Sequence, residues 1–475
     1  MRTLVLGMLV ACVVWQAGAG RLRAAPPNIV FILCDNLGNG DVACFHPGTK
    51  HRTPNLDRMA AEGRRFTSFY SASGVCTPSR AALMTGCYPR RVGLHLSYEN
   101  QLVLKPVDKK GLHPAEETMA EILQAAGYET LCLGKWHLGD QAEFLPTRHG
   151  FDHYLGIPYS EDMTARTILG RTWPELPLLR DERVIEAPVD MQHLTKRLTA
   201  EAVRFISQRR ECPFFLYFAE TGPGSRRDPY PGPDFAGKSA NGPYGDAIEE
   251  LDWSAGEVLK AIRASVLDGT TLVIWTSDNG APRRDPPQGS NAPYTGSGYN
   301  TSEGAQRMPC IARWFGHIPA GTVCDELCTM MDFLPTFAQL AGGTMPRQPI
   351  DGHDIRDLLF GKPGATSPYD EQGFFYYHGP QLQAVRAGPW KLYLPLESRF
   401  AAGKAAAAPQ KLALYDVRRD VSEQHEVSAQ HPDIVSKLAG MAAKARLTLG
   451  DGDARGSGQR EPGWVEQPQP LLLAR

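Results

Sequence analysis

Long apolar runs that stop abruptly at polar residues are the main pattern of this chain. Residues 28–34, 213–218 and 271–276 form such runs, and continuous apolar runs are typical of strands buried on both faces of a sheet. Between them, residues 117–126 and 242–262 have apolar positions at helical spacing. The pattern predicts an α/β fold built on a large, mostly parallel sheet.

Two of the expected strands end in the same pair of polar residues. Asp35 and Asn36 follow the first run, and Asp278 and Asn279 follow the third. Because ligands of open parallel sheets bind beyond the carboxyl ends of the strands, we expect the two pairs to converge on one site. Two carboxylates and two amide oxygens suit Ca²⁺ or Mg²⁺ and do not suit zinc. For either pair alone, a turn that ends a strand is the simpler interpretation.

Another candidate site lies where a helix is expected to begin. Pro78 stands just inside an Ala-, Leu- and Met-rich run, which predicts a helix with Cys76 at its start. Free N–H groups and the helix dipole favour an anion there, and Arg80 lies one turn away on the same face, where it can hold that anion. Without further context, a buried cysteine that opens an ordinary helix is the simpler interpretation.

The pattern changes after a turn-rich stretch at 361–364. Short aromatic and β-branched runs follow and predict a small antiparallel sheet; they lie at 373–377, 384–388 and 390–393. The last residues, 450–475, are rich in Gly, Pro and Gln, so we expect them to be poorly ordered.

The N-terminus has the features of an export signal. Arg2 provides the positive start, residues 4–15 an apolar stretch, and residues 17–19 a small-residue cleavage site. The apolar stretch is too short for a confident transmembrane span. Residues 9–12 also resemble a bacterial lipobox, which would leave Cys12 lipidated, although the apolar run continues past that cysteine. We expect an exported protein, in the periplasm, the extracellular space or the lysosome.

Charge and cysteine content argue against some classes of protein. The formal net charge is −2 and the pI is near 6.7, so there is no electrostatic case for binding nucleic acid or an anionic membrane. Ten cysteines in 475 residues do not make a disulfide scaffold. The expected organisation is a signal peptide over 1–25, a large α/β domain over 26–364, an antiparallel subdomain over 365–449 and a poorly ordered tail over 450–475.

The segment from Cys76 to Gly86 carries a family resemblance. Cys-x-Pro-Ser-Arg followed by Ala-Ala-Leu-x-Thr-Gly resembles the signature of the type I, formylglycine-dependent sulfatases. Elsewhere in the chain, as at 156–160, the resemblance is to the arylsulfatase A and N-acetylgalactosamine-6-sulfatase branches of that family. The resemblance implies an alkaline-phosphatase-like fold and a divalent metal, Ca²⁺ or Mg²⁺, held by the two Asp-Asn pairs. It also implies that a formylglycine-generating enzyme oxidises Cys76, whose hydrated aldehyde is then the nucleophile.

A further segment, 134–139, resembles the second signature of that family. Lys135 and His137 stand two residues apart, so in extended backbone both would point to one side. By resemblance, Lys135 binds a sulfate oxygen, and His137 contacts the formylglycine hydroxyl and acts as a base. Ser160, in a motif at 156–160, is implied to touch the substrate. A lone lysine or histidine would more simply be a solvated or satisfied side chain.

The chain departs from the family pattern at three points. Asn36 stands where the family has a second aspartate, which removes one formal negative charge and predicts weaker metal binding or a tighter demand on the bound sulfate. Gly224 stands where a histidine serves as acid for the leaving group. A lysine expected between 296 and 304 has no counterpart. Cations that could replace that lysine are Arg226, Arg227 and Arg307, and Arg307 is a candidate substrate-binding residue.

These observations predict a hydrolase that cleaves a sulfate ester on a sulfated sugar or glycan, or an aryl sulfate. Loss of the acid would slow cleavage of alkyl sulfates more than that of aryl sulfates, because aryl leaving groups are better. One alternative is a catalytically impaired protein that binds sulfated glycans. Another is a phosphatase or phosphonate hydrolase on the same fold, although such enzymes usually carry Ser or Thr as nucleophile and two metals.

Overall fold

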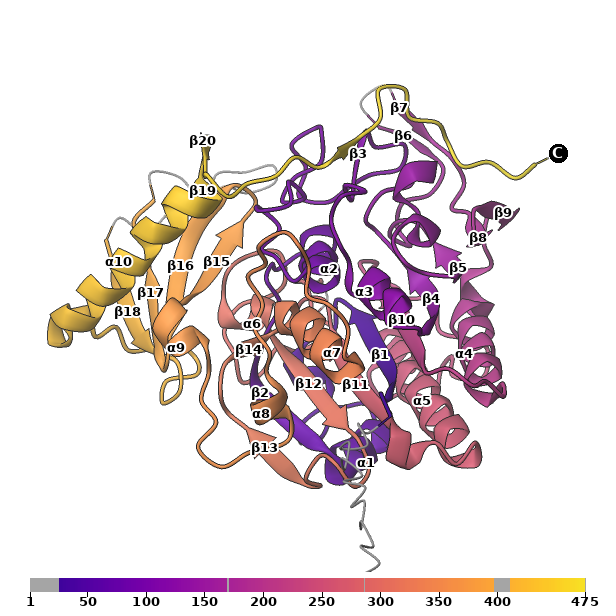
Figure 1. Ribbon diagram of the computed structural model, residues 1–475, viewed down its shortest axis with the longest axis horizontal. Coiled ribbons are helices and arrows are strands. Elements are labelled where there is room, and N and C mark those ends of the chain that lie inside the picture. Colours follow the sequence, from indigo (N-terminus) through magenta and orange to yellow (C-terminus); the bar gives the residue numbers. More distant parts are fainter. Residues whose placement is uncertain (1–24, 169–170, 286, 397–410, 475) are drawn as a thin grey trace, which may run out of the picture.

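The computed structural model describes residues 25–168, 171–285, 287–396 and 411–474 (Figure 1). The expected signal peptide, with Cys12, lies almost entirely outside the described residues. In Figure 1 a large α/β body is flanked on one side by a smaller sheet with one long helix.

The large body is built on one mixed sheet, whose centre is parallel in the order β11-β1-β10-β4-β5. Antiparallel strands extend it, with β12 next to β11 and β8 next to β5. This confirms the predicted mostly parallel central sheet. Its strands are β1 (Asn28–Asp35), β2 (Arg64–Tyr70), β4 (Glu129–Lys135), β5 (His153–Ile157), β8 (Leu178–Arg180), β9 (Arg183–Glu186), β10 (Phe214–Pro223), β11 (Thr271–Ser277), β12 (Arg307–Arg313), β13 (Thr322–Cys324) and β14 (Cys328–Thr329).

Helices cover both faces of this sheet. The helices described in the whole chain, including α9 and α10 beside the smaller sheet, are α1 (Pro54–Glu62), α2 (Cys76–Thr85), α3 (Met119–Ala125), α4 (Met191–Ser207), α5 (Gly242–Ala264), α6 (Glu303–Gln306), α7 (Phe333–Ala341), α8 (Arg356–Leu359), α9 (Tyr369–Gln372) and α10 (Pro432–Leu449). Single 3₁₀ turns occur at Asn39–Asp41, Ala142–Phe144, Pro146–Arg148, Asp268–Thr270, Met330–Asp332 and Ser428–Gln430.

The position of strand β1 between two cores explains why its sequence is an unbroken apolar run. Ile29, Phe31 and Leu33 belong to a core beneath α2, α3 and α7, whereas Val30 and Ile32 belong to a second core beneath α1, α4 and α5. Since successive side chains of a strand point to opposite faces, a strand between two cores must be apolar at every position.

The smaller sheet is antiparallel, as the sequence predicts. Its order is β15-β16-β17-β18 and α10 packs against it. Its strands are β15 (Phe374–His378), β16 (Gln381–Ala387), β17 (Trp390–Tyr393) and β18 (Ala413–Asp416). Two-stranded ribbons pair β6 (Arg166–Ile168) with β7 (Arg171–Trp173), β19 (Gly450–Asp451) with β20 (Ala454–Arg455), and β3 (Lys110–Gly111) with β21 (Gly463–Trp464).

The tail differs from the prediction of poor order. Residues 450–474 run from α10 back across the large body, and β21 pairs with β3. Arg460 donates from Nε and Nη2 to the two carboxylate oxygens of Glu116 at 2.6 and 2.7 Å. The composition of residues 450–475 suggests disorder because few of them are apolar. Composition contains no information about a bidentate ion pair with a distant residue.

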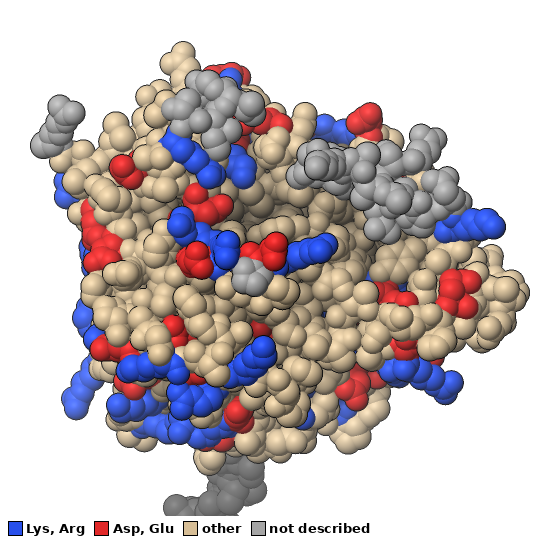
Figure 2. Space-filling view, turned by 180° about the vertical axis from the view of Figure 1, so that it is seen from behind, with Lys and Arg blue, Asp and Glu red and all other residues tan. Residues whose placement is uncertain are grey.

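The surface agrees with the modest net charge. On the face in Figure 2, acidic and basic side chains are interspersed, with wide uncharged areas between them. Among the described residues, no helix is both long and apolar enough to cross a membrane.

A buried ionic cluster joins the two sheets. Glu303, on α6, accepts hydrogen bonds from Lys391 Nζ at 2.9 Å and Tyr376 Oη at 2.9 Å, both from the smaller sheet. Arg307 Nη1 lies 3.4 Å and Arg386 Nη1 3.9 Å from its other oxygen. Burial opposes ionisation of Glu303, but these cations hold its pKa below the usual value.

We expect Glu303→Gln to destabilise the protein by about 3–5 kcal/mol, because it leaves buried cations without their counter-charge. Denaturant unfolding of the variant measures the change. Asp357→Asn is the matched control, since it breaks an exposed pair with Lys362 and should change stability little. Equal stability of the two variants would contradict a structural role for the cluster.

Candidate active site

The carboxyl ends of the central strands bring the predicted polar residues together. Asp35 is the last residue of β1, and Asp278 directly follows β11. The strands are neighbours, and the N–H of Asn36 donates to Asp278 Oδ1 at 3.0 Å. The two Asp-Asn pairs therefore share one site, as the strand pattern predicts.

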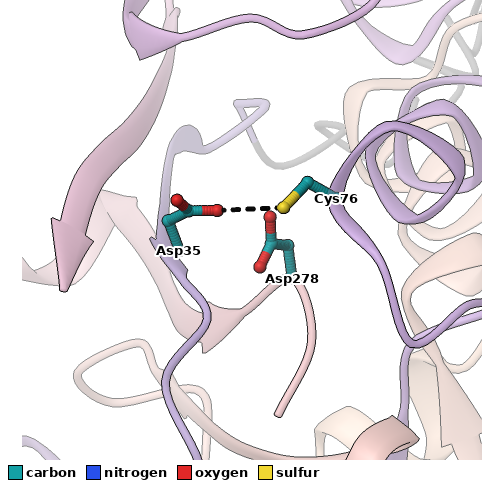
Figure 3. Close-up of side chains that lie close together, drawn as sticks. All are labelled: Asp35, Cys76 and Asp278. Carbon is teal, nitrogen blue, oxygen red and sulfur yellow. Dashed lines mark hydrogen bonds between the residues drawn. The ribbon is translucent and has the colours of Figure 1, made fainter. Parts of the chain in front are cut away.

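Cys76 reaches this site from the first position of α2. Its Sγ lies 3.3 Å from Asp35 Oδ1 and 3.8 Å from Asn36 Oδ1, and Figure 3 shows it facing Asp35 and Asp278. One ligand atom from each of Cys76, Asp35 and Asp278 lies within 4.8 Å of the others. The predicted helix start thus meets the predicted strand ends.

Two cations from different elements neutralise the carboxylates. Arg80 Nη2 lies 2.8 Å from Asp278 Oδ2 and 3.3 Å from Asp35 Oδ1. Lys135, the last residue of β4, places Nζ 2.9 Å from the same Asp35 oxygen. All four side chains are fully buried, so each charge needs the others. Two carboxylates and two cations have a formal net charge of zero.

Burial and these charges set the protonation states. Burial by itself would raise the pKa of Asp35, but Lys135 and Arg80 hold it below the usual value. Burial raises the pKa of Asp278 despite the nearby Arg80. Burial, with the negative charges of Asp278 and Asp35, raises the pKa of the Cys76 thiol well above its ordinary value. Since the thiolate is the nucleophilic form of cysteine, unmodified Cys76 is a poor nucleophile.

His137 lies close to the cluster but is not in extended backbone, which corrects the predicted geometry. The strand ends at Lys135, and His137 adopts φ +64°. Its Nε2 lies 3.1 Å from the carbonyl of Leu104; a carbonyl only accepts, so Nε2 carries the proton. Nδ1 is buried and has no partner among the described residues. Burial, Lys135 and Arg80 lower the pKa of the ring, which makes it a neutral acceptor.

Oxygen atoms at the strand ends fit a hard cation. Within the described part of the chain, Asp35 Oδ2 and Asn279 Oδ1 are buried and have no hydrogen-bond partner, and a bound ion or water is one explanation of such an oxygen. Asn36 Oδ1 lies 2.5 Å from Asn279 Nδ2, and Asp278 completes the group. Four oxygen donors of this kind suit Ca²⁺ or Mg²⁺.

Comparison with known proteins decides the family. The sulfatase family profile matches residues 27–343, and the profile of the C-terminal region of aryl-sulfatase matches residues 370–462. The chain belongs to the sulfatase family. It is 38% identical to human arylsulfatase A over 461 residues, covering 88% of each chain. It is 37% identical to the N-acetylgalactosamine-6-sulfatase of Sus scrofa over 403 residues, covering 79% of this chain and 73% of the other.

Solved structures of similar proteins have the same fold. The PsFucS1 sulfatase from Pseudoalteromonas sp. superposes with a TM-score of 0.77 at 28% identity, covering 88% of this chain and 89% of that one. Ps i-CgsB, in complex with a neocarrahexaose, gives a TM-score of 0.72 at 26% identity, covering 88% and 92%. Sulfatases are sulfuric ester hydrolases, so the relationship supports hydrolysis of a sulfate ester.

In this sulfatase Ser160 lies beside the cluster, together with a residue that the motifs do not indicate. Ser160 Oγ accepts from Lys135 Nζ at 3.0 Å and donates to Glu161 Oε2 at 2.7 Å. Glu161 is 4% exposed. No sequence signal singles it out, because side chains that follow one another in extended backbone ordinarily point to opposite sides.

Arg307, which the sequence predicts as a candidate substrate-binding residue, has other partners in the structure. The Arg307 guanidinium donates to the carbonyl of Thr67 at 2.6 Å and to Ser68 Oγ at 3.0 Å, and it lies 3.4 Å from Glu303. The physical reason is the demand of buried Glu303 for counter-charges, which the sequence does not reveal because the partners come from distant segments.

We expect Asn36→Asp to bind Ca²⁺ roughly tenfold more tightly than the wild type, because a second carboxylate adds Coulomb attraction worth on the order of 1.4 kcal/mol. Isothermal titration with CaCl₂ on metal-stripped protein checks this. Asp325→Asn, a change at an exposed carboxylate outside the pocket, is the control and should leave the affinity unchanged. Equal affinities of Asn36→Asp and wild type would show that residue 36 does not contact the ion.

Proposed function

We propose that this sulfatase hydrolyses a sulfate ester with a nucleophile derived from Cys76, in a pocket shared by a divalent ion, Arg80 and Lys135. The observation that carries the proposal is the contact of Cys76, Arg80 and Lys135 with one carboxylate oxygen, Asp35 Oδ1. Three residues from two elements, α2 and β4, meet there, at the strand ends where α/β enzymes bind ligands.

A hydrated formylglycine at position 76 would supply a hydroxyl nucleophile. The protonated thiol of Cys76 argues for such a modification, since a buried thiol beside two carboxylates does not attack sulfur readily. Cys76 is 3% exposed, so a formylglycine-generating enzyme would have to reach it before the domain closes. That enzyme is therefore a proposed partner during maturation.

Arg80 and Lys135 would bind and orient the sulfate oxygens. The four charged side chains sum to zero, so a divalent ion gives the pocket a formal charge of +2, which favours a sulfate monoanion and the charge that develops in the transition state. Asp35, Asn36, Asp278 and Asn279 would hold that ion, Ca²⁺ or Mg²⁺, whose chemistry is to polarise a sulfate oxygen. These groups are fixed before substrate arrives.

His137 would accept a proton. Its Nδ1 is the unprotonated nitrogen, and burial together with the two cations lowers the pKa of the ring. A neutral imidazole can take the proton of the remaining formylglycine hydroxyl when sulfate leaves, which regenerates the aldehyde. We assign Ser160 to substrate contact because it hydrogen-bonds Lys135.

The proposed substrate class is a sulfated sugar or glycan, with aryl sulfates as alternatives. Its support is the naming of similar proteins: an N-acetylgalactosamine-6-sulfatase among the curated relatives and a neocarrahexaose complex among the solved structures. We also propose export, on the pattern of residues 1–25.

A second candidate function is binding of sulfated glycans without turnover. The observation that favours it is Gly224, which offers no side chain where the family motif has its acid. A binder of this kind would retain the cations of the pocket and lack Cys76-dependent chemistry.

We expect the wild type, expressed with a formylglycine-generating enzyme, to cleave 4-nitrophenyl sulfate, and Cys76→Ala to lose at least about 10³-fold in kcat/KM, since it removes the nucleophile. Release of nitrophenol measures the rate. Peptide mass spectrometry across residue 76 checks for the mass difference between thiol and aldehyde. Cys212→Ala, at an exposed cysteine, is the control and should retain the wild-type rate. If the wild type is no faster than Cys76→Ala, the result favours binding of sulfated glycans without turnover.

A further inference from the structure

Glu161 occupies a position in the pocket that neither sulfatase signature explains. Its Oε2 accepts from Ser160 Oγ at 2.7 Å, and Ser160 accepts from Lys135 Nζ at 3.0 Å. Lys135 in turn contacts Asp35 at 2.9 Å. A chain of hydrogen bonds therefore connects the Glu161 carboxyl through Ser160 to Lys135, beside Asp35 and Cys76.

The Glu161 carboxyl fills the space that a side chain at residue 224 would need. A Cβ atom on Gly224 would lie 2.4 Å from Glu161 Oε1 and 2.7 Å from its Cδ. Gly224 also adopts φ +77°, a region that L side chains rarely occupy. Position 224 is where the family motif has its histidine, so this chain has a carboxyl at the point from which that histidine would extend.

The carboxyl is held firmly in place. The N–H groups of Ser225 and Arg226 both donate to Glu161 Oε1. Arg284 braces the same loop, donating to the carbonyls of Gly224 and Arg226. A group fixed by its own hydrogen bonds and by a braced loop is pre-organised, which is what proton transfer to a bound substrate requires.

We propose that Glu161 is the acid that protonates the leaving alcohol, in place of the histidine missing at position 224. The inference rests on the proposed function. As the formylglycine hydroxyl bonds to sulfur, it releases its proton to solvent water. The S–O bond to the alcohol breaks, its electron pair stays on the ester oxygen, and that oxygen takes the Glu161 proton. Glu161 becomes a carboxylate and takes a proton back from solvent, which balances the proton released by the nucleophile.

The surroundings of Glu161 favour this role. Burial raises its pKa, and the negative charges of Asp35 and Asp162 add to the shift against the opposing effects of Lys135 and of the hydrogen bond from Ser160. Among other charged or titratable groups nearby, Arg226 lines a small cavity of about 20 Å³ with Glu161, and Tyr299 interacts with it electrostatically. Glu161 also lines an open cavity of about 290 Å³ with Thr164 and Tyr230, which gives water a route to reprotonate it.

The test compares phenyl sulfates whose leaving groups range from 4-nitrophenol to the more basic 4-methoxyphenol. We expect Glu161→Gln to lose roughly 10²-fold in kcat/KM on 4-methoxyphenyl sulfate and less than about 10-fold on 4-nitrophenyl sulfate, because only the poor leaving group needs the proton. Glu250→Gln is the matched control: Glu250 is a buried glutamate at the same small cavity, bound to the N–H of Gly232, and it should leave the ratio of the two rates unchanged.

A measurement on the wild type covers the case in which Glu161→Gln does not fold. The kcat/KM of the wild type for 4-methoxyphenyl sulfate should fall as pH rises through the raised pKa of Glu161, because the acid form is then lost. Its kcat/KM for 4-nitrophenyl sulfate should fall much less. Equal pH profiles, or equal losses on both substrates in Glu161→Gln, would overturn the inference and leave the proposed function standing. Absence of Cys76-dependent turnover would overturn both.

Discussion

A single carboxylate oxygen, Asp35 Oδ1, organises the pocket. Cys76 Sγ, Arg80 Nη2 and Lys135 Nζ all lie within 3.3 Å of it. Two of these residues come from α2 and one from the end of β4. Removing two cations and two carboxylates from water is costly unless they satisfy one another. The core around β1 can therefore form only when α2, β4 and β11 are all in their native positions. The fold and the reactive site are consequences of the same electrostatic constraint.

Backbone conformation at the strand ends contributes to this arrangement. Asn36 and His137, each just beyond a central strand, adopt φ +62° and +64°, a conformation that costs energy for residues other than glycine. The turn at Asn36 lets its N–H donate to Asp278, and the turn at His137 directs one ring nitrogen to the Leu104 carbonyl. The rigid sheet below supports both conformations, which place polar atoms where extended backbone would not.

The sequence was informative where structure is decided locally. Apolar runs located β1, β10 and β11, the Pro78 signal located the start of α2, and the repeated Asp-Asn pair predicted that two strand ends would meet. The sequence was not informative where distant counter-charges decide. Arg307 contacts Glu303 and two residues of β2, and Glu161 owes its position to a loop more than 60 residues later in the chain. Side-chain direction at such positions depends on partners that no local pattern contains.

The tail has a consequence for how the molecule is made. Arg460 and Glu116 are separated by 344 positions, so the contact that pins the chain across the large body cannot form until nearly all of it has left the ribosome. Contacts of such long range close late, and partly folded chains of this size expose surfaces that aggregate. During translation the large body of this protein is therefore nearly complete before the contact of Arg460 with Glu116 can form.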